Sequence, residues 1–175
     1  MKSLPDLFSN NEKWRHEIEQ RHPGFFKALG EQQNPEYLWI GCADSRVPAN
    51  DVVGMMPGEL FVHRNVANLV NHTDLYLLSV LQSAVDVLKV KHIMVVGHYG
   101  CGGIKAAMED VPHGLIDNWL RQVRELYLRN RKNLAELPDD SARVDKMCEL
   151  NVARQVINVS NTTVVQEAWR RDQPL

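Results

Sequence analysis

Two short segments combine cysteine, histidine and carboxylate side chains with residues that allow tight turns. The first is Cys42-Ala43-Asp44-Ser45-Arg46, and the second is His98-Tyr99-Gly100-Cys101-Gly102-Gly103. Two thiolates and one imidazole suit Zn²⁺, and three protein ligands leave one tetrahedral position for water, as in catalytic zinc sites. The spacing alone also leaves open a pair of structural cysteines buried at strand ends.

Asp44 lies two residues after Cys42 and two residues before Arg46. Its carboxylate could complete a zinc tetrahedron or accept a hydrogen bond from a zinc-bound water. Because arginine can pair with a carboxylate through two hydrogen bonds, Arg46 could decide between these positions. The segment therefore predicts a two-position switch.

Predicted strands position both segments. Residues 37–42 (YLWIGC) and 91–97 (KHIMVVG) are nearly continuous apolar runs, typical of strands buried on both faces of a parallel sheet, and residues 59–66 (ELFVHRNV) form a third. In open α/β sheets the carboxyl ends of parallel strands meet at the edge where ligands bind. Neighbouring strands would therefore bring the two cysteines and the histidine of the two segments together.

Helices are predicted between and after these strands. A capping box formed by Ser9 and Glu12 predicts a first helix from about Asn10 to Arg21, and Thr73 is the predicted N-cap of a later one. The other predicted helices cover 25–33, most of the chain after residue 101, and 163–171. Strands that alternate with helices predict an α/β fold, a parallel sheet core with flanking helices.

The composition limits the class of protein. The chain has 175 residues, 44% of them apolar, and 20 Lys+Arg against 22 Asp+Glu, which gives a formal charge of −2. This length suits a single domain, and the near-neutral balance predicts no nucleic acid partner and no membrane association. Three cysteines make a poor disulfide framework and favour a reducing compartment, so we expect a cytoplasmic protein. We assign Cys148, on an apolar helix face, to the core.

The motifs in order are similar to those of the β-class carbonic anhydrases. The resemblance rests on CADSR with VPAN, HRNVAN at 63–68 and GHYGCGG at 97–103, and it extends through LIDNW at 115–119 and CELNV at 148–152. It implies a single domain over 1–175, with an N-terminal helical arm at 1–35 and an α/β core at 36–175. It also implies a strand order of second, first, third.

The resemblance implies a zinc enzyme. The family's zinc ligands fall on Cys42, His98 and Cys101, with Asp44 as the fourth ligand of a closed state, and Asp44 with Arg46 matches its catalytic dyad. The implied reaction is the reversible hydration of CO2 to bicarbonate and a proton by zinc-bound hydroxide. Alternatives are a truncated, non-catalytic zinc-binding subunit and a related hydrolase of carbonyl sulfide or carbon disulfide.

Further positions are implied by the same resemblance. The substrate-binding residues would be Gln33, Phe61, Val62 and Gly102, and the chain would form a homodimer or homotetramer. Trp39 and Arg64 match a non-catalytic bicarbonate site of the bacterial, bicarbonate-regulated type II branch.

Departures from the family pattern lead to further expectations. A tyrosine of the bicarbonate site and two further strands would lie beyond residue 175, so we expect a C-terminally short fold, weaker bicarbonate inhibition and a third strand at a free edge. Tyr76 and Ser83 differ from the residues common in the family at these positions near the site. We expect these differences to affect the rate of turnover and not the binding of zinc.

Overall fold

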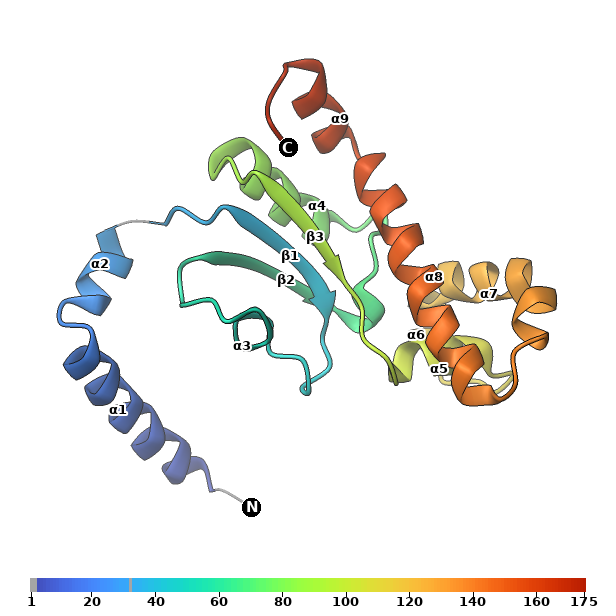
Figure 1. The fold of residues 1–175 in the computed structure, drawn as a ribbon, viewed down its shortest axis with the longest axis horizontal. Helices are drawn as coiled ribbons and strands as arrows, with labels where there is room; N and C mark the ends of the chain where they lie inside the picture. Colours follow the sequence, from blue (N-terminus) through green and yellow to red (C-terminus); the bar gives the residue numbers. More distant parts are fainter. Residues whose placement is uncertain (1–2, 32) are drawn as a thin grey trace. The chain divides into compact units, whose positions relative to one another are not determined.

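The computed structural model describes residues 3–31 and 33–175. Contacts between residues divide the chain into two compact units, with the boundary between Asn34 and Pro35. The described part of the first unit is helical, and the second unit contains a sheet with helices (Figure 1). The prediction of one domain over 1–175 remains a prediction.

The first unit contains α1 (Leu4–Arg21) and α2 (Phe25–Glu31), with the rings of Trp14 and Phe26 packed edge to face, their centroids 5.7 Å apart. The predicted start of the first helix at Asn10 is wrong. Ser3 is the N-cap, and its backbone N–H donates to a carboxylate oxygen of Asp6 at 2.6 Å.

Proline within the first turn favours this earlier start, because the first helical N–H groups need no partner in the helix. Ser9 and Glu12 therefore lie inside α1. The predicted extension of α2 to Gln33 is also wrong, because α2 ends at Glu31 and Gln33 lies outside any helix. Gln32 lies outside the described residues.

The second unit is built on three parallel strands. They are β1 (Tyr37–Cys42), β2 (Leu60–Asn65) and β3 (His92–Val96), in the order β2-β1-β3. The predicted strand order is confirmed. Since β1 pairs on both sides, all its residues but the first are buried, whereas the residues of β3 stay partly exposed. The prediction of burial on both faces therefore holds for β1 and is wrong for β3.

The helical segments of this unit cover the sheet and its carboxyl edge. They are α3 (Ala49–Val53), η1 (Val66–Asn68), α4 (Leu75–Gln82), η2 (Ser83–Val87), α5 (Gly102–Met108), α6 (Ile116–Trp119), α7 (Arg121–Ala135), α8 (Asp140–Ser160) and α9 (Thr163–Arg170).

The two faces of β1 pack against different partners. Leu38 and Ile40 lie in one apolar cluster with residues of α4, η2 and α9, while Trp39 packs near Ala49 of α3. A third cluster joins the strand end at Cys42 to α5, α7 and α8. In the part of the chain that the structure describes, no helix is long and apolar enough to cross a membrane.

The predicted N-cap at Thr73 is wrong by one residue. Asp74 caps α4, and its carboxylate accepts from the backbone N–H groups of Tyr76 and Leu77 at 3.0 and 3.3 Å. The hydroxyl of Thr73 instead donates to the Asn71 side chain at 2.9 Å. The adjacent Asp74 therefore takes the cap position that Thr73 was predicted to hold.

Candidate metal centre

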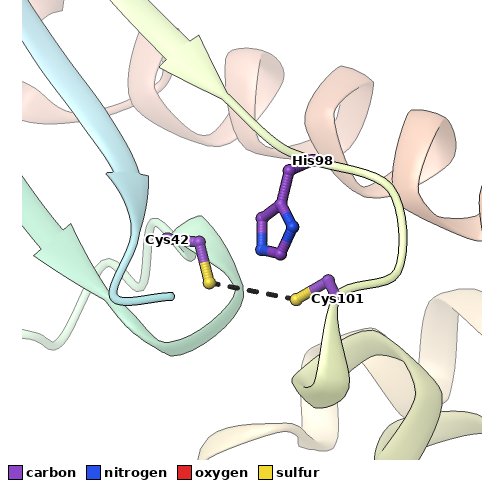
Figure 2. Close-up of side chains that lie close together, drawn as sticks. All are labelled: Cys42, His98 and Cys101. Atoms are coloured by element: carbon purple, nitrogen blue, oxygen red, sulfur yellow. Dashed lines mark hydrogen bonds between the residues drawn. The ribbon is translucent and has the colours of Figure 1, made fainter. Parts of the chain in front are cut away.

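The carboxyl ends of β1 and β3 bring the three soft side chains together (Figure 2). Cys42 is the last residue of β1, His98 follows β3 by two residues, and Cys101 is the N-cap of α5. Their ligand atoms all lie within 4.8 Å of one another, and the two sulfurs are 3.9 Å apart. The convergence expected from adjacent parallel strands is present.

His98 is oriented by its own loop. Its Nδ1 lies 3.0 Å from the backbone carbonyl of Tyr99 and donates to it in the tautomer with the proton on Nδ1. Its Nε2 is buried and has no hydrogen-bond partner. A buried ring nitrogen that has no hydrogen-bond partner and lies beside two sulfurs is free to bind a metal. Nitrogen and sulfur are the ligand atoms that Zn²⁺ prefers, so these residues fit a metal such as Zn²⁺.

The two thiols form one proton-sharing pair. A hydrogen bond from Cys101, followed by contacts with His98 and the backbone N–H groups of Asp44 and Ala67, lowers the pKa of Cys42 against the opposing effect of burial. The same hydrogen bond and burial raise the pKa of Cys101. The pair therefore holds one thiolate readily, a charge that attracts a cation.

Asp44 is held by Arg46 through both carboxylate oxygens. The guanidinium Nε donates to Oδ1 at 2.9 Å, Nη2 donates to Oδ2 at 2.7 Å, and the Arg46 backbone N–H donates to Oδ1 at 3.0 Å. These bonds hold the pKa of Asp44 well below its usual range. Oδ2 lies 3.7 Å from Nε2 of His98, so the carboxylate borders the cluster.

Arginine side chains also join the loops of the site. Arg46 Nη2 donates to the carbonyl of Gly100 at 3.1 Å, which links the loop after β1 to the loop after β3. Arg64 on β2 donates from Nε to the carbonyl of Cys42 at 2.8 Å and from Nη2 to the carbonyl of Asp44 at 2.5 Å. The backbone on both sides of Ala43 is therefore fixed from a neighbouring strand.

The other predicted site residues are dispersed. Trp39 is buried in β1, and on β2 Phe61 is partly buried and Val62 is exposed. Gly102 begins α5, where an added Cβ would meet no atom within 4 Å. Gln33 belongs to the first unit and is exposed.

A turn that follows β2 also faces the cluster, and the sequence reasoning gave it no role. Ala67 is fully buried and has a left-handed backbone, with φ 64°, and its N–H contributes to the lowered pKa of Cys42. The sequence signal for this turn is the HRNVAN segment at 63–68, from which only the strand over 59–66, a role for Arg64 and part of the family resemblance are predicted.

Comparison with known proteins identifies the family. The family model described as carbonic anhydrase matches residues 37–175. The chain belongs to the carbonic anhydrases. A carbonic anhydrase from Emericella nidulans is 45% identical over 166 residues, which are 95% of this chain and 73% of that protein.

Solved structures identify the class as β. The Coccomyxa β-carbonic anhydrase, solved with acetazolamide, is 45% identical with a TM-score of 0.94, covering 100% of this chain and 79% of that one. One of two tetrameric β-carbonic anhydrases from Sordaria macrospora is 38% identical with a TM-score of 0.92, covering 95% of this chain and 86% of that one. This β-carbonic anhydrase thus has the α/β fold expected from its sequence.

Proposed function

We propose that this chain catalyses the reversible hydration of CO2 to bicarbonate and a proton at a zinc site held by Cys42, His98 and Cys101. The observation that carries the proposal is the convergence of their three ligand atoms within 4.8 Å, with Nε2 of His98 buried and unpartnered. A Zn²⁺ ion bound there would supply a water whose pKa is lowered to about 7, and with it a nucleophile at neutral pH.

Asp44 and Arg46 are the proposed catalytic dyad. Because the bidentate pairing keeps the Asp44 carboxylate ionised, this carboxylate can accept a hydrogen bond from a water near the cluster and orient it. A carboxylate with so low a pKa is a poor proton store at neutral pH, so the proton leaves to buffer. If Arg46 released Asp44, the carboxylate would be free to ligate the metal, and the pair would act as the proposed switch.

Substrate contacts are proposed from the resemblance. Phe61 and Val62 would line the CO2 pocket, Gly102 would leave the substrate room at the start of α5, and Gln33 would bind bicarbonate across a subunit interface. The chain would then act as a homodimer or homotetramer, and the tetrameric Sordaria macrospora relatives support an oligomer. A cytoplasmic location remains a prediction.

Trp39 and Arg64 are proposed as a regulatory bicarbonate site of the type II kind. Support comes from the hydrogen bonds of Arg64 to the carbonyls of Cys42 and Asp44. An anion that drew this guanidinium away would release the backbone that presents Asp44. Bicarbonate would in this way favour the closed, Asp44-ligated state.

The deciding experiment is stopped-flow CO2 hydration across pH, on protein with measured zinc content. We expect one zinc per chain and activity that rises with pH. Stoichiometric zinc without CO2 hydration would contradict the proposal and favour a non-catalytic zinc-binding subunit. Hydrolysis of carbonyl sulfide or carbon disulfide in place of CO2 hydration would instead favour the related hydrolase.

A further inference from the structure

Residues from three of the sequence motifs meet at the turn formed by η1, residues 66–68. The turn itself belongs to the HRNVAN motif. Trp119, from LIDNW, donates its indole N–H to the carbonyl of Val66 at 2.8 Å. Asn151, from CELNV, donates its side-chain N–H to the carbonyl of Ala67 at 2.9 Å. Two helices far apart in the sequence thus hold two successive peptide groups of one turn.

The turn has a backbone conformation that L-residues rarely adopt. Ala67 has φ 64° and Asn68 has φ 48°, both in the left-handed region, and both side chains are buried. Such a conformation persists only where the surroundings over-determine it, and strain of this kind gathers at functional sites. The hydrogen bonds that Trp119 and Asn151 donate fix this left-handed conformation.

The strained turn faces the metal ligands. The backbone N–H of Ala67 is the smallest of the contributions that lower the pKa of Cys42. Ala67 also lies in the same buried cluster as Cys42 and Cys101. A Cβ added to Gly103, two residues after Cys101, would come within 2.9 Å of Val66 and 3.3 Å of Ala67, so the start of α5 sits directly on the turn.

The peptide group between Val66 and Ala67 links an indole to a metal-ligand sulfur. Trp119 donates to its carbonyl, and the Ala67 that carries its N–H lies in one buried cluster with Cys42, whose pKa that N–H helps to lower. A hydrogen bond to the carbonyl of a peptide group polarises its N–H, so the indole makes the N–H of Ala67 a stronger donor. Donors to ligand atoms orient them and tune the bound metal.

We propose that Trp119 and Asn151 are positioning residues of the metal centre, which keep the turn at 66–68 left-handed and so aim the N–H of Ala67 at the Cys42 sulfur. The inference rests on the metal ligand set of the proposed function. Neither side chain touches the substrate in this account; both act through Ala67.

The same helix provides a matched control. Gln155 joins Asn151 to the backbone N–H of Val70 through bonds of 2.9 and 2.8 Å, and Asn158 donates to the carbonyl of Val70 at 3.1 Å. Asn158 therefore holds the same loop from α8, three residues away from the peptide that faces the sulfur. General loosening of the loop should affect variants of Asn151 and Asn158 alike.

The test uses the full chain loaded with Co²⁺ in place of Zn²⁺, because thiolate-to-Co²⁺ charge transfer reports directly on the ligand sulfurs. Trp119→Phe keeps an aromatic ring and deletes the indole N–H, Asn151→Leu deletes the amide donor, and Asn158→Leu is the control. Loss of an N–H donor raises the energy of the sulfur electrons. We therefore expect Trp119→Phe and Asn151→Leu to move the band to longer wavelength and to weaken Co²⁺ binding about tenfold, measured by chelator competition.

The control should leave both the band and the affinity unchanged. An unmoved band in Trp119→Phe overturns the inference, and so does an equal shift in Asn158→Leu. If Asn151→Leu does not fold, Trp119→Phe alone decides. A parent protein that shows no thiolate band with Co²⁺ would overturn the ligand set of the proposed function, whereas a parent with the band and variants without the shift would overturn this inference only.

Discussion

Arg46 holds the carboxylate of Asp44 by both oxygens, at 2.9 and 2.7 Å, and with the same guanidinium reaches the carbonyl of Gly100 in the opposite loop. One side chain therefore fixes the position of the acid and the spacing of the two loops that carry the cysteines. Because its partner Asp44 stays ionised far below neutral pH, the pairing is maintained throughout the range in which the enzyme would work.

The first prediction concerns this pair. Arg46→Ala should retain the metal and lose activity about 10- to 100-fold, the range typical of residues that hold a metal-site group in place. The reason is that Asp44 would be free to bind the metal. Metal content per chain and stopped-flow CO2 hydration measure the two effects. Arg46→Lys keeps the charge without the bidentate geometry and should lie between parent and alanine variant; metal loss in Arg46→Ala would contradict the prediction.

A second prediction separates ligand from core cysteines. Cys42→Ser should weaken zinc binding by at least about tenfold and abolish activity, because a hydroxyl is a poorer ligand than a thiolate. Cys148→Ser is the matched control, since Cys148 is also a buried free thiol. It should keep zinc after dialysis. Equal zinc loss in the two variants would show that the ligand assignment is wrong.

Bicarbonate inhibition gives a third prediction, which rests on the proposed regulatory site. Arg64→Leu should raise the half-inhibiting bicarbonate concentration about tenfold or more, the loss expected for one hydrogen bond to a charged group. Inhibition is measured at fixed pH and ionic strength, with chloride as the control anion. An unchanged inhibition curve in a variant that still binds zinc would exclude Arg64 from the site.

A fourth prediction follows from His63, which is buried beneath Tyr76 with its Nδ1 unpartnered. Burial lowers the pKa of His63 below its ordinary value of 6.5, against a smaller opposing effect from Asp74. The unfolded chain then binds more protons than the folded one, so stability is full above about pH 6.5 and falls as the pH drops below it. The urea midpoint of the parent should decrease from pH 7.5 to 5.5.

The variant His63→Gln should show a smaller decrease in that midpoint, because it has no imidazole to protonate. His16→Gln, at an exposed position of α1, is the control and should follow the parent. If the urea midpoint falls equally in His63→Gln and in the parent, groups other than His63 cause the acid sensitivity.

The sequence predicted the central strand and the ligand cluster because both follow from simple geometry. β1 begins and ends where the apolar run does, since a strand with partners on both sides is buried along its length. Cys42 ends β1, and His98 and Cys101 follow β3, whose carboxyl end lies beside that of β1 because the two strands are parallel neighbours. By contrast, the helix starts at Ser3 and Asp74 were not predicted. Thr73 and Asp74 are adjacent and each can serve as a cap, while Ser9 with Glu12 matches the capping-box pattern inside a helix that begins earlier.

The turn at Ala67 could not be predicted from local sequence. Nothing about an alanine favours a positive φ, and the donors that hold this turn come from Trp119 and Asn151. Val66 and Trp119 are 53 residues apart, and Ala67 and Asn151 are 84 apart. Only the assembled fold brings these groups together.

The separation of the two ligand sulfurs has a consequence for how the chain folds. Cys42 and Cys101 are 59 residues apart, and the segment between them contains all of β2 and β3. Any ion that joins both sulfurs therefore closes a long loop, and in an unfolded chain such closure costs about 4 kcal/mol of conformational entropy. The metal centre should therefore form after the strands have paired. Once formed, it should slow the unfolding of the strands between the two cysteines, because they cannot separate fully while both sulfurs hold the ion.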